Sequence, residues 1–384
     1  MLSRSKLDLR AQVGQTLIMG FDGVKMSGKL RTTLEKLQPA GVILFARNIK
    51  EPQQTWELLR ECQRAVAAPL FLCVDMEGGT VDRMRDVIAP LPSAAAVAAS
   101  GNRKLFRLHG RVIGQECCAL GFNTDFAPVL DLALEPSRTV LASRTVSPDS
   151  KQTVVYGREF LRGLQDAYVL GCGKHFPGLG EATLDTHREL AVVTKPWKRL
   201  WSEDLYPYRA LCRQMPFVMI AHAAFPAVTK GPVPASLSSK WIRDILRKKI
   251  GFRRLIVSDD LEMGAVQTAQ PIGEAAVSTL KAGADLFLVC HYERDVLEAY
   301  EKVLKTAERD PAFALRVAEA ARHVITFKAR SRELKHRHPK PTPAVVEKLG
   351  RAIWELEEEV RLASMAITEP SAIGSRPSPK RRNA

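Results

Sequence analysis

The chain has 384 residues, 46% of them hydrophobic and 26% charged, which is typical of a globular protein and excludes a collagen-like or mainly disordered chain. Its net charge of +15 permits an anionic partner. However, the basic clusters near the C-terminus lack the interleaved aromatic side chains of a nucleic-acid stacking surface, so we expect no nucleic-acid partner. The 7 cysteines form no Cys-x-x-Cys pair, which argues against a disulfide framework and a zinc ribbon.

No apolar run approaches the roughly 18 residues of a membrane span, and the N-terminal segment lacks the apolar core of a signal peptide. We therefore expect a cytoplasmic protein without a membrane partner, and a monomer.

Short apolar runs rich in β-branched residues alternate with amphipathic stretches along the chain. A run that is apolar at every position fits a parallel strand buried on both faces. The predicted strands cover residues 15–21, 41–47, 69–75, 122–132, 168–176, 217–222, 255–260 and 284–290, and the clearest helices cover 56–68, 151–167 and 239–251. Strand and then helix, eight times over, predicts an α/β fold, a single (β/α)8 TIM-type barrel with a C-terminal helical extension.

Polar residues at the strand ends favour this barrel over an open, doubly wound sheet, which shows the same alternation. A barrel gathers all its strand ends around one mouth, whereas an open sheet gathers only those beside its switch point. The predicted strands end in Asp75, Asp131, Lys174 with His175, His222, and Asp259 with Asp260.

The segment after the eighth strand divides by composition. Residues 292–310 and 311–330 read as two helices that complete a barrel unit of residues 1–330. Residues 331–343 form a charged, proline-interrupted linker, and 344–368 read as a C-terminal helix. The basic, Pro/Ser-rich end, 369–384, is expected to be disordered.

Residues 23–30 match part of a phosphate-binding loop, but Leu30 stands where that loop needs a Ser or Thr hydroxyl for magnesium. A loop that enters a helix at Ser27 or Gly28 is the better interpretation. No group of residues shows a metal-ligand spacing such as H-E-x-x-H. We therefore expect neither a cofactor nor a metal.

The Gly- and Pro-rich segment 173–187 directly follows a predicted strand and is dense in titratable residues. Asp185 and His187 lie two positions apart, so in an extended loop the carboxylate can orient the imidazole and raise its basicity. This would make an acid/base pair near neutral pH. A helix cap at Asp185 beside an exposed His187 is the structural alternative.

Two further strand ends carry acids. Asp259 and Asp260 end one strand, where one carboxylate can face the barrel axis and either attack an anomeric carbon or bind a metal, while its neighbour serves as a helix cap or a supporting acceptor. Two acids that only cap the following helix are the structural alternative. Asp75 and Arg83 flank a Gly-Gly turn and together suit vicinal sugar hydroxyls. A structural Asp75–Arg83 salt bridge is the alternative.

These segments resemble glycoside hydrolase family 3, and within it the β-N-acetylhexosaminidases of bacterial cell-wall recycling. The matching stretches, in family order, are 41–49, 74–85, 126–132, 143–146, 173–187, 218–228 and 256–266. The resemblance implies a retaining hydrolysis through a covalent glycosyl-enzyme. It places the nucleophile on Asp259 and the acid/base pair on His187 and Asp185.

The same resemblance places sugar contacts on Asp75, Arg83, Arg144, Lys174 and His175, around a terminal N-acetylglucosamine. It also implies a small carbohydrate substrate, such as a muropeptide with an N-acetylglucosaminyl-1,6-anhydromuramyl unit. The chain departs from the family pattern at Thr80, Leu179 and Glu181, which flank the expected site.

Other functions stay open at this stage. Family 3 also contains β-glucosidases and N-acetylglucosaminide phosphorylases, and a histidine acid/base would tolerate phosphate as the acceptor. The three departures and the basic tail would also fit a non-catalytic sugar-binding barrel. The presence of Asp259, Asp185 and His187 together favours the enzyme.

Overall fold

The computed structural model describes residues 8–184 and 189–368. Its main sheet is parallel and has the spatial order β6-β3-β2-β1-β12-β11-β9-β7. The strands are β1 (Leu17–Met19), β2 (Gly41–Ile43), β3 (Phe71–Val74), β6 (Thr124–Asp125), β7 (Cys172–Phe176), β9 (Phe217–Ile220), β11 (Leu255–Asp260) and β12 (Leu286–Val289). Each lies inside a predicted run.

The sheet closes on itself. Each strand lies beside its predecessor in the chain, and the two end strands, β6 and β7, come together through the parallel bridges Thr124–Leu170 and Val129–Lys174. A doubly wound sheet would reverse its strand order at a switch point. The predicted (β/α)8 barrel is therefore confirmed, and the open sheet is excluded.

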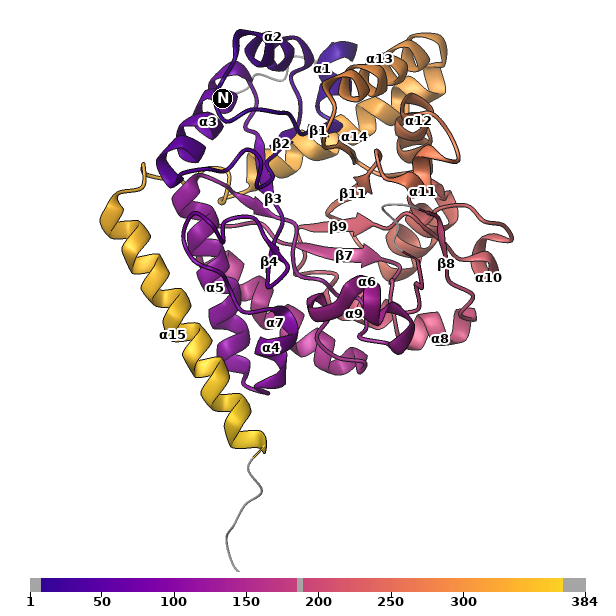
Figure 1. Cartoon of the computed structure of the whole chain (residues 1–384). Helices are drawn as coiled ribbons and strands as arrows, with labels where there is room; N and C mark the ends of the chain where they lie inside the picture. The colour runs from indigo at the N-terminus through magenta and orange to yellow at the C-terminus, as the bar shows by residue number, and fades with distance from the viewer. Residues whose placement is uncertain (1–7, 185–188, 369–384) are drawn as a thin grey trace, which may run out of the picture.

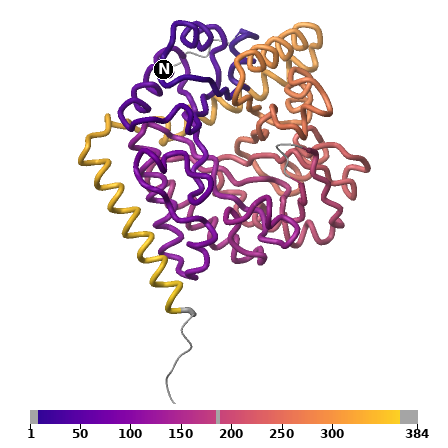
Figure 2. The backbone as a smooth tube through the Cα atoms, in the orientation of Figure 1, coloured from indigo at the N-terminus to yellow at the C-terminus, as the bar shows by residue number. Residues whose placement is uncertain are grey.

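Helices cover the outside of the barrel between successive strands (Figure 2). They are α2 (Gly28–Leu37), α3 (Pro52–Ala65), α5 (Arg103–Leu120), α7 (Ser150–Asp166), α9 (Leu205–Leu211), a π-type helix at Lys240–Ile250, α12 (Ile272–Ala282), α13 (Glu293–Arg309) and α14 (Pro311–Arg330). The Ser27 hydroxyl caps α2 by accepting the Leu30 amide at 3.0 Å. This confirms the helix-entry interpretation of residues 23–30.

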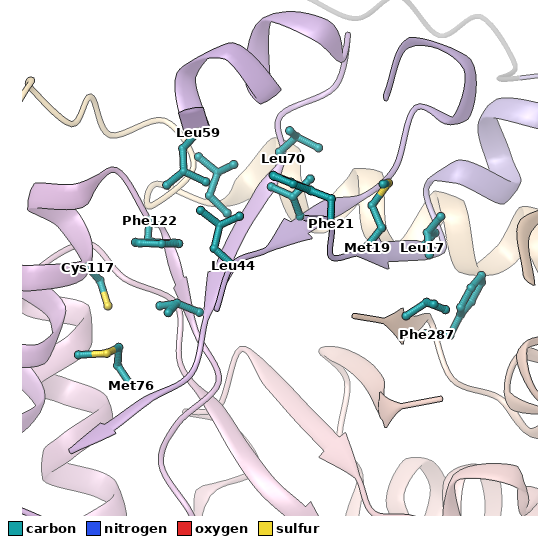
Figure 3. Close-up of a cluster of buried hydrophobic side chains, with 14 of the residues drawn as sticks. Leu17, Met19, Phe21, Leu44, Leu59, Leu70, Met76, Cys117, Phe122 and Phe287 are labelled. Carbon is teal, nitrogen blue, oxygen red and sulfur yellow. The ribbon is translucent and has the colours of Figure 1, made fainter. Parts of the chain in front are cut away.

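The strands are apolar on both faces because each face meets a different core layer. On β1, Leu17 and Met19 pack with Phe287 in the cluster between strands and outer helices (Figure 3). Ile18 instead belongs to the cluster that fills the barrel interior with Leu288. Alternation of side chains along a strand produces this division.

Helix α15 (Pro343–Thr368) lies outside the barrel along α5 (Figure 1). It buries Leu349, Ile353 and Leu356, whose spacing of four and three residues places them on one helix face. Trp354 is 65% exposed on another face. Among the described residues, no helix combines the length and apolar character needed to cross a membrane.

Candidate active site

A cavity of about 380 Å³ opens at the end of the barrel where the strands finish. This is the end at which barrel enzymes carry their chemistry. A larger cavity, about 700 Å³, lies at the opposite end, beside residues that precede the strands, such as Gly171 and Pro216. The charged groups that border the smaller cavity are Asp75, Glu77, Arg83, Arg144, Lys174, His175, Asp259, Asp260 and His291.

A buried ion network forms one wall. Glu77 accepts two N–H groups of Arg144 at 2.8 and 2.9 Å, and its carboxylate lies 2.6 Å from Lys174 Nζ. Lys174 Nζ also donates to Asp75 at 2.7 Å. Burial would raise the pKa of Glu77, but Arg144 and Lys174 outweigh it and hold that pKa well below its usual value. The network therefore fixes two cations at the cavity surface.

A tight hairpin delivers Glu77 to this network. Strands β4 (Met76–Gly78) and β5 (Val81–Asp82) pair antiparallel directly after β3. Gly78 and Gly79 turn the chain at φ +79° and +60°, where a side chain is strained. A Cβ at Gly78 would also lie 2.2 Å from the Pro92 carbonyl oxygen. The Gly-Gly pair thus lets the acidic residue face the cavity.

His175 is held by a buried carboxylate. Asp131 accepts from His175 Nδ1 at 2.7 Å and from the Leu179 amide at 2.7 Å. This leaves His175 Nε2 toward Arg144, 3.5 Å from its guanidinium nitrogen. Because Asp131 ends a predicted strand, the sequence contained a signal for it, but only the structure shows that it positions His175.

Both acids at the end of β11 border the cavity. The Asp260 amide donates to Asp259 Oδ1 at 2.9 Å. The register of β11 against β12 shifts between Val257 and Asp260, so simple alternation no longer sends the second acid away from the mouth. Asp260 instead lies 3.1 Å from His291 Nδ1 and accepts the Glu262 amide at 3.1 Å.

His291 forms part of the rim and was not predicted. Hydrogen bonds to Asp260 and Glu262 raise its pKa to about 9, so the imidazole is protonated at neutral pH. Its ring stacks on Phe45 with centroids 5.3 Å apart. The sequence signals for the site were acidic residues at the ends of predicted strands. Neither Phe45 nor His291 is such a residue, which explains why the sequence did not identify them.

The alternative expectation, a salt bridge between Asp75 and Arg83, was wrong. Asp75 pairs with Lys174 rather than with Arg83. The Arg83 guanidinium instead lies 5.6 Å from the centroid of the Phe45 ring, a cation–π arrangement. Arg83 therefore borders the cavity while its guanidinium rests against the Phe45 ring.

The two expected acid/base residues, Asp185 and His187, lie outside the described residues. The chain before them is anchored at Glu181, which lies 3.3 Å from the buried Lys195. Lys195 in turn donates to Asp204 at 2.7 Å. Of the family departures, Leu179 is buried beside the cavity and Thr80 is exposed at the hairpin turn.

One group beside the cavity brings three potential metal ligands together, namely Asp260, Glu262 and His291. However, the Glu262 oxygens already accept the backbone amides of Cys290, His291 and Tyr292 at 2.6 to 2.8 Å. These amides lie in the chain directly before α13, so Glu262 holds this connection in place. We assign the group a structural role.

Comparisons with known proteins identify the family of the chain. The model of the "Glycosyl hydrolase family 3 N terminal domain" matches residues 8–327. A protein named β-hexosaminidase from Alkalilimnicola ehrlichii is 34% identical over 309 residues, 78% of this chain and 87% of that protein. Another from Nitrosomonas eutropha is 35% identical over 282 residues, 72% of this chain and 80% of that protein.

A solved structure shows the same likeness in three dimensions. The glycoside hydrolase family 3 β-N-acetylglucosaminidase of a Paenibacillus species superposes with a TM-score of 0.83 at 32% identity. The match covers 91% of this chain and 69% of that one.

Proposed function

Because the chain belongs to glycoside hydrolase family 3 and is a glycosidase of the β-hexosaminidase type, we propose that it releases terminal β-linked N-acetylglucosamine with retention of configuration. The observation that supports this proposal is the cavity at the strand ends, which Asp259 borders together with the Glu77–Arg144–Lys174 network. A carboxylate nucleophile and fixed hydrogen-bond donors are the parts that such a reaction needs.

In the first step, the Asp259 carboxylate attacks the anomeric carbon and forms an ester as the glycosidic C–O bond breaks. The leaving oxygen takes a proton from His187, which Asp185 orients. In the second step, His187 removes a proton from water as that water attacks the anomeric carbon and frees Asp259. His187 is thereby reprotonated, and the cycle closes without a cofactor.

The network determines where the sugar ring sits. Arg144, Lys174 and His175 are held on their inner sides by Glu77, Asp75 and Asp131. Their positions are thus fixed before substrate arrives, which reduces the entropy cost of binding. We assign ring-hydroxyl contacts to Asp75, Arg83, Arg144, Lys174 and His175.

The proposed substrate is the N-acetylglucosaminyl-1,6-anhydromuramyl fragment of bacterial cell wall, with or without peptide, in the cytoplasm. All residues assigned here lie between positions 75 and 259, so we assign the reaction to the barrel unit, residues 1–330. The linker 331–343 and the helix that follows take no part in the chemistry.

A slow 2-fluoro or 5-fluoro glycoside tests the nucleophile, because it leaves the ester in place for tandem mass spectrometry. We expect one label per chain, on Asp259, and neither label nor turnover in Asp259→Asn. Asp260→Asn is the matched control and should still be labelled. A label on Asp260, or no label on active protein, would refute the assignment.

Chromogenic substrates test the reaction class. We expect cleavage of the β-N-acetylglucosaminide, little cleavage of the β-glucoside, and no effect of phosphate on the rate. Formation of a sugar 1-phosphate would instead show a phosphorylase. Sugar binding without turnover would show a non-catalytic barrel.

A further inference from the structure

We propose that Cys118, His336 and His338 form a binding site for a Zn²⁺-like divalent cation, away from the sugar cavity. One potential ligand atom from each residue lies within 4.8 Å of the others. Cys118 belongs to α5, and both histidines belong to the chain between α14 and α15. The site would therefore join two parts of the chain that are more than 200 residues apart.

The residues around this cluster fix His338 in place. The His338 carbonyl oxygen accepts the Trp56 indole N–H and an Arg60 guanidinium N–H, both at 2.9 Å. Its imidazole is 5% exposed, and Nδ1 lies 2.9 Å from Cys118 Sγ. His338 Nε2 is buried without a hydrogen-bond partner. The contact with Cys118 is made through Nδ1, so Nδ1 is the potential ligand atom of His338.

His336 is also held in a defined orientation. Its ring stacks on Tyr168 with centroids 4.1 Å apart and planes inclined by 6°. A stack this parallel restricts rotation of the imidazole and keeps its nitrogens near the cluster. Both histidines are thus oriented by contacts outside the site, as ligands of structural metals are.

The ligand chemistry selects a borderline-soft cation. One sulfur and two imidazole nitrogens suit Zn²⁺, whereas Mg²⁺ and Ca²⁺ require oxygen ligands. Binding would displace the Cys118 proton to solvent and form a Zn–thiolate bond, and water would complete the tetrahedron.

A Cys118–His338 hydrogen bond is the simpler explanation of the 2.9 Å contact. It leaves the approach of His336 without an explanation. Coordination requires a small opening, since tetrahedral bonds of about 2.3 Å to sulfur and about 2.0 Å to nitrogen separate the two atoms by about 3.5 Å. The histidines lie outside regular helices and strands, where such a shift needs no change of secondary structure.

The position indicates a structural role. The chain between α14 and α15 leads to the helix that lies along α5 (Figure 1). A metal bound to Cys118 would pin this connection to α5 itself. Tying the connection at this point limits the movement of α15 away from the barrel.

Cobalt substitution tests the site on the full chain after metal removal. We expect one Co²⁺ per chain, with tetrahedral d–d bands and a near-ultraviolet thiolate-to-cobalt charge-transfer band. Zn²⁺ should displace the Co²⁺ and raise the Tm. Cys118→Ser should abolish the charge-transfer band, and His336→Gln should weaken Zn²⁺ binding about 100-fold.

Two further variants separate the possible outcomes. Cys212→Ser removes another half-buried cysteine and should leave both bands unchanged. His291→Gln should also leave binding unchanged, because it alters only the group at the sugar cavity. Loss of metal in His291→Gln, or equal metal binding in wild type, Cys118→Ser and His336→Gln, would overturn the proposal.

Discussion

Glu77 is the carboxylate on which the cavity wall depends. It is 3% exposed, and it contacts two cations, Arg144 and Lys174, through three short contacts of 2.6 to 2.9 Å. Glu77→Gln keeps the shape of the side chain but removes its charge. The amide can accept on only one oxygen, so its NH₂ group must face a cation.

The loss of stability in Glu77→Gln depends on which buried cation loses its partner. Breaking a buried ion pair by removing one partner costs about 3 to 5 kcal/mol. Lys174 keeps Asp75 at 2.7 Å, whereas Arg144 loses its bidentate carboxylate. We therefore expect the lower end of this range, about 3 kcal/mol, which corresponds to a fall in Tm of about 6 °C at about 2 °C per kcal/mol.

The stabilisation that Glu77 contributes changes with pH in a defined direction. Because the pKa of Glu77 is depressed in the folded chain, its contribution is present above the unfolded pKa and is lost as the pH falls through the folded value. The Tm difference between wild type and Glu77→Gln should thus be constant above about pH 5 and shrink in more acidic solution.

Thermal unfolding by circular dichroism measures this effect, and steady-state cleavage of the N-acetylglucosaminide measures its consequence for the site. Glu57→Gln is the control, because Glu57 pairs with Lys340 at the surface, where both side chains are about half exposed. That pair is worth less than about 1 kcal/mol. Equal Tm values for the two variants would refute the reasoning.

Three further outcomes are expected. Asp131→Asn should reduce kcat/KM about 10- to 100-fold and also lower the Tm, because it weakens the hold on His175 by a buried carboxylate; unchanged kinetics would contradict that role. Lys328 is fully buried, and burial lowers its pKa to about 7, so wild-type stability should rise with pH between about 7 and 10.5; Lys328→Met should flatten this rise in thermal unfolding. The raised pKa of His291 stabilises the fold below about pH 6.5 and loses that effect as the pH passes about 9; an unaltered stability profile in His291→Gln would exclude it.

The barrel could be predicted because its signals are local. Strand β12 is apolar on both faces, and strand β11 begins with three buried apolar residues and ends in the polar residues Ser258, Asp259 and Asp260. Each of these features can be read in a window of a few residues. The closure between β6 and β7 could not be read in this way, because the bridges depend on the register of strands that no local pattern specifies.

The candidate site was only partly predictable for the same reason. Acids at strand ends indicated Asp75 and Asp259, but the pairs that fix the site join distant positions. Glu77 lies 67 residues from Arg144, and Asp131 lies 44 residues from His175. Both members of each pair are present in the sequence, but no local pattern shows that they are in contact. The same holds for Cys118 and His338, whose contact only the folded chain brings about.

The balance of charge at the cavity bears on which acceptor the proposed reaction uses. Among the described residues, the bordering carboxylates are Asp75, Glu77, Asp259 and Asp260, and the cations are Arg83, Arg144, Lys174 and the protonated His291. A phosphate acceptor needs a surplus of positive charge or donors left unpaired. Here Arg144 and Lys174 are already engaged by buried acids, so an added anion would have to compete with Glu77. A neutral sugar only needs donors whose directions are fixed. Arg144 and Lys174 therefore do not favour phosphate as the acceptor, and the effect of phosphate on the rate tests whether Arg83, whose buried Nε has no hydrogen-bond partner in the part of the chain that the structure describes, binds it instead.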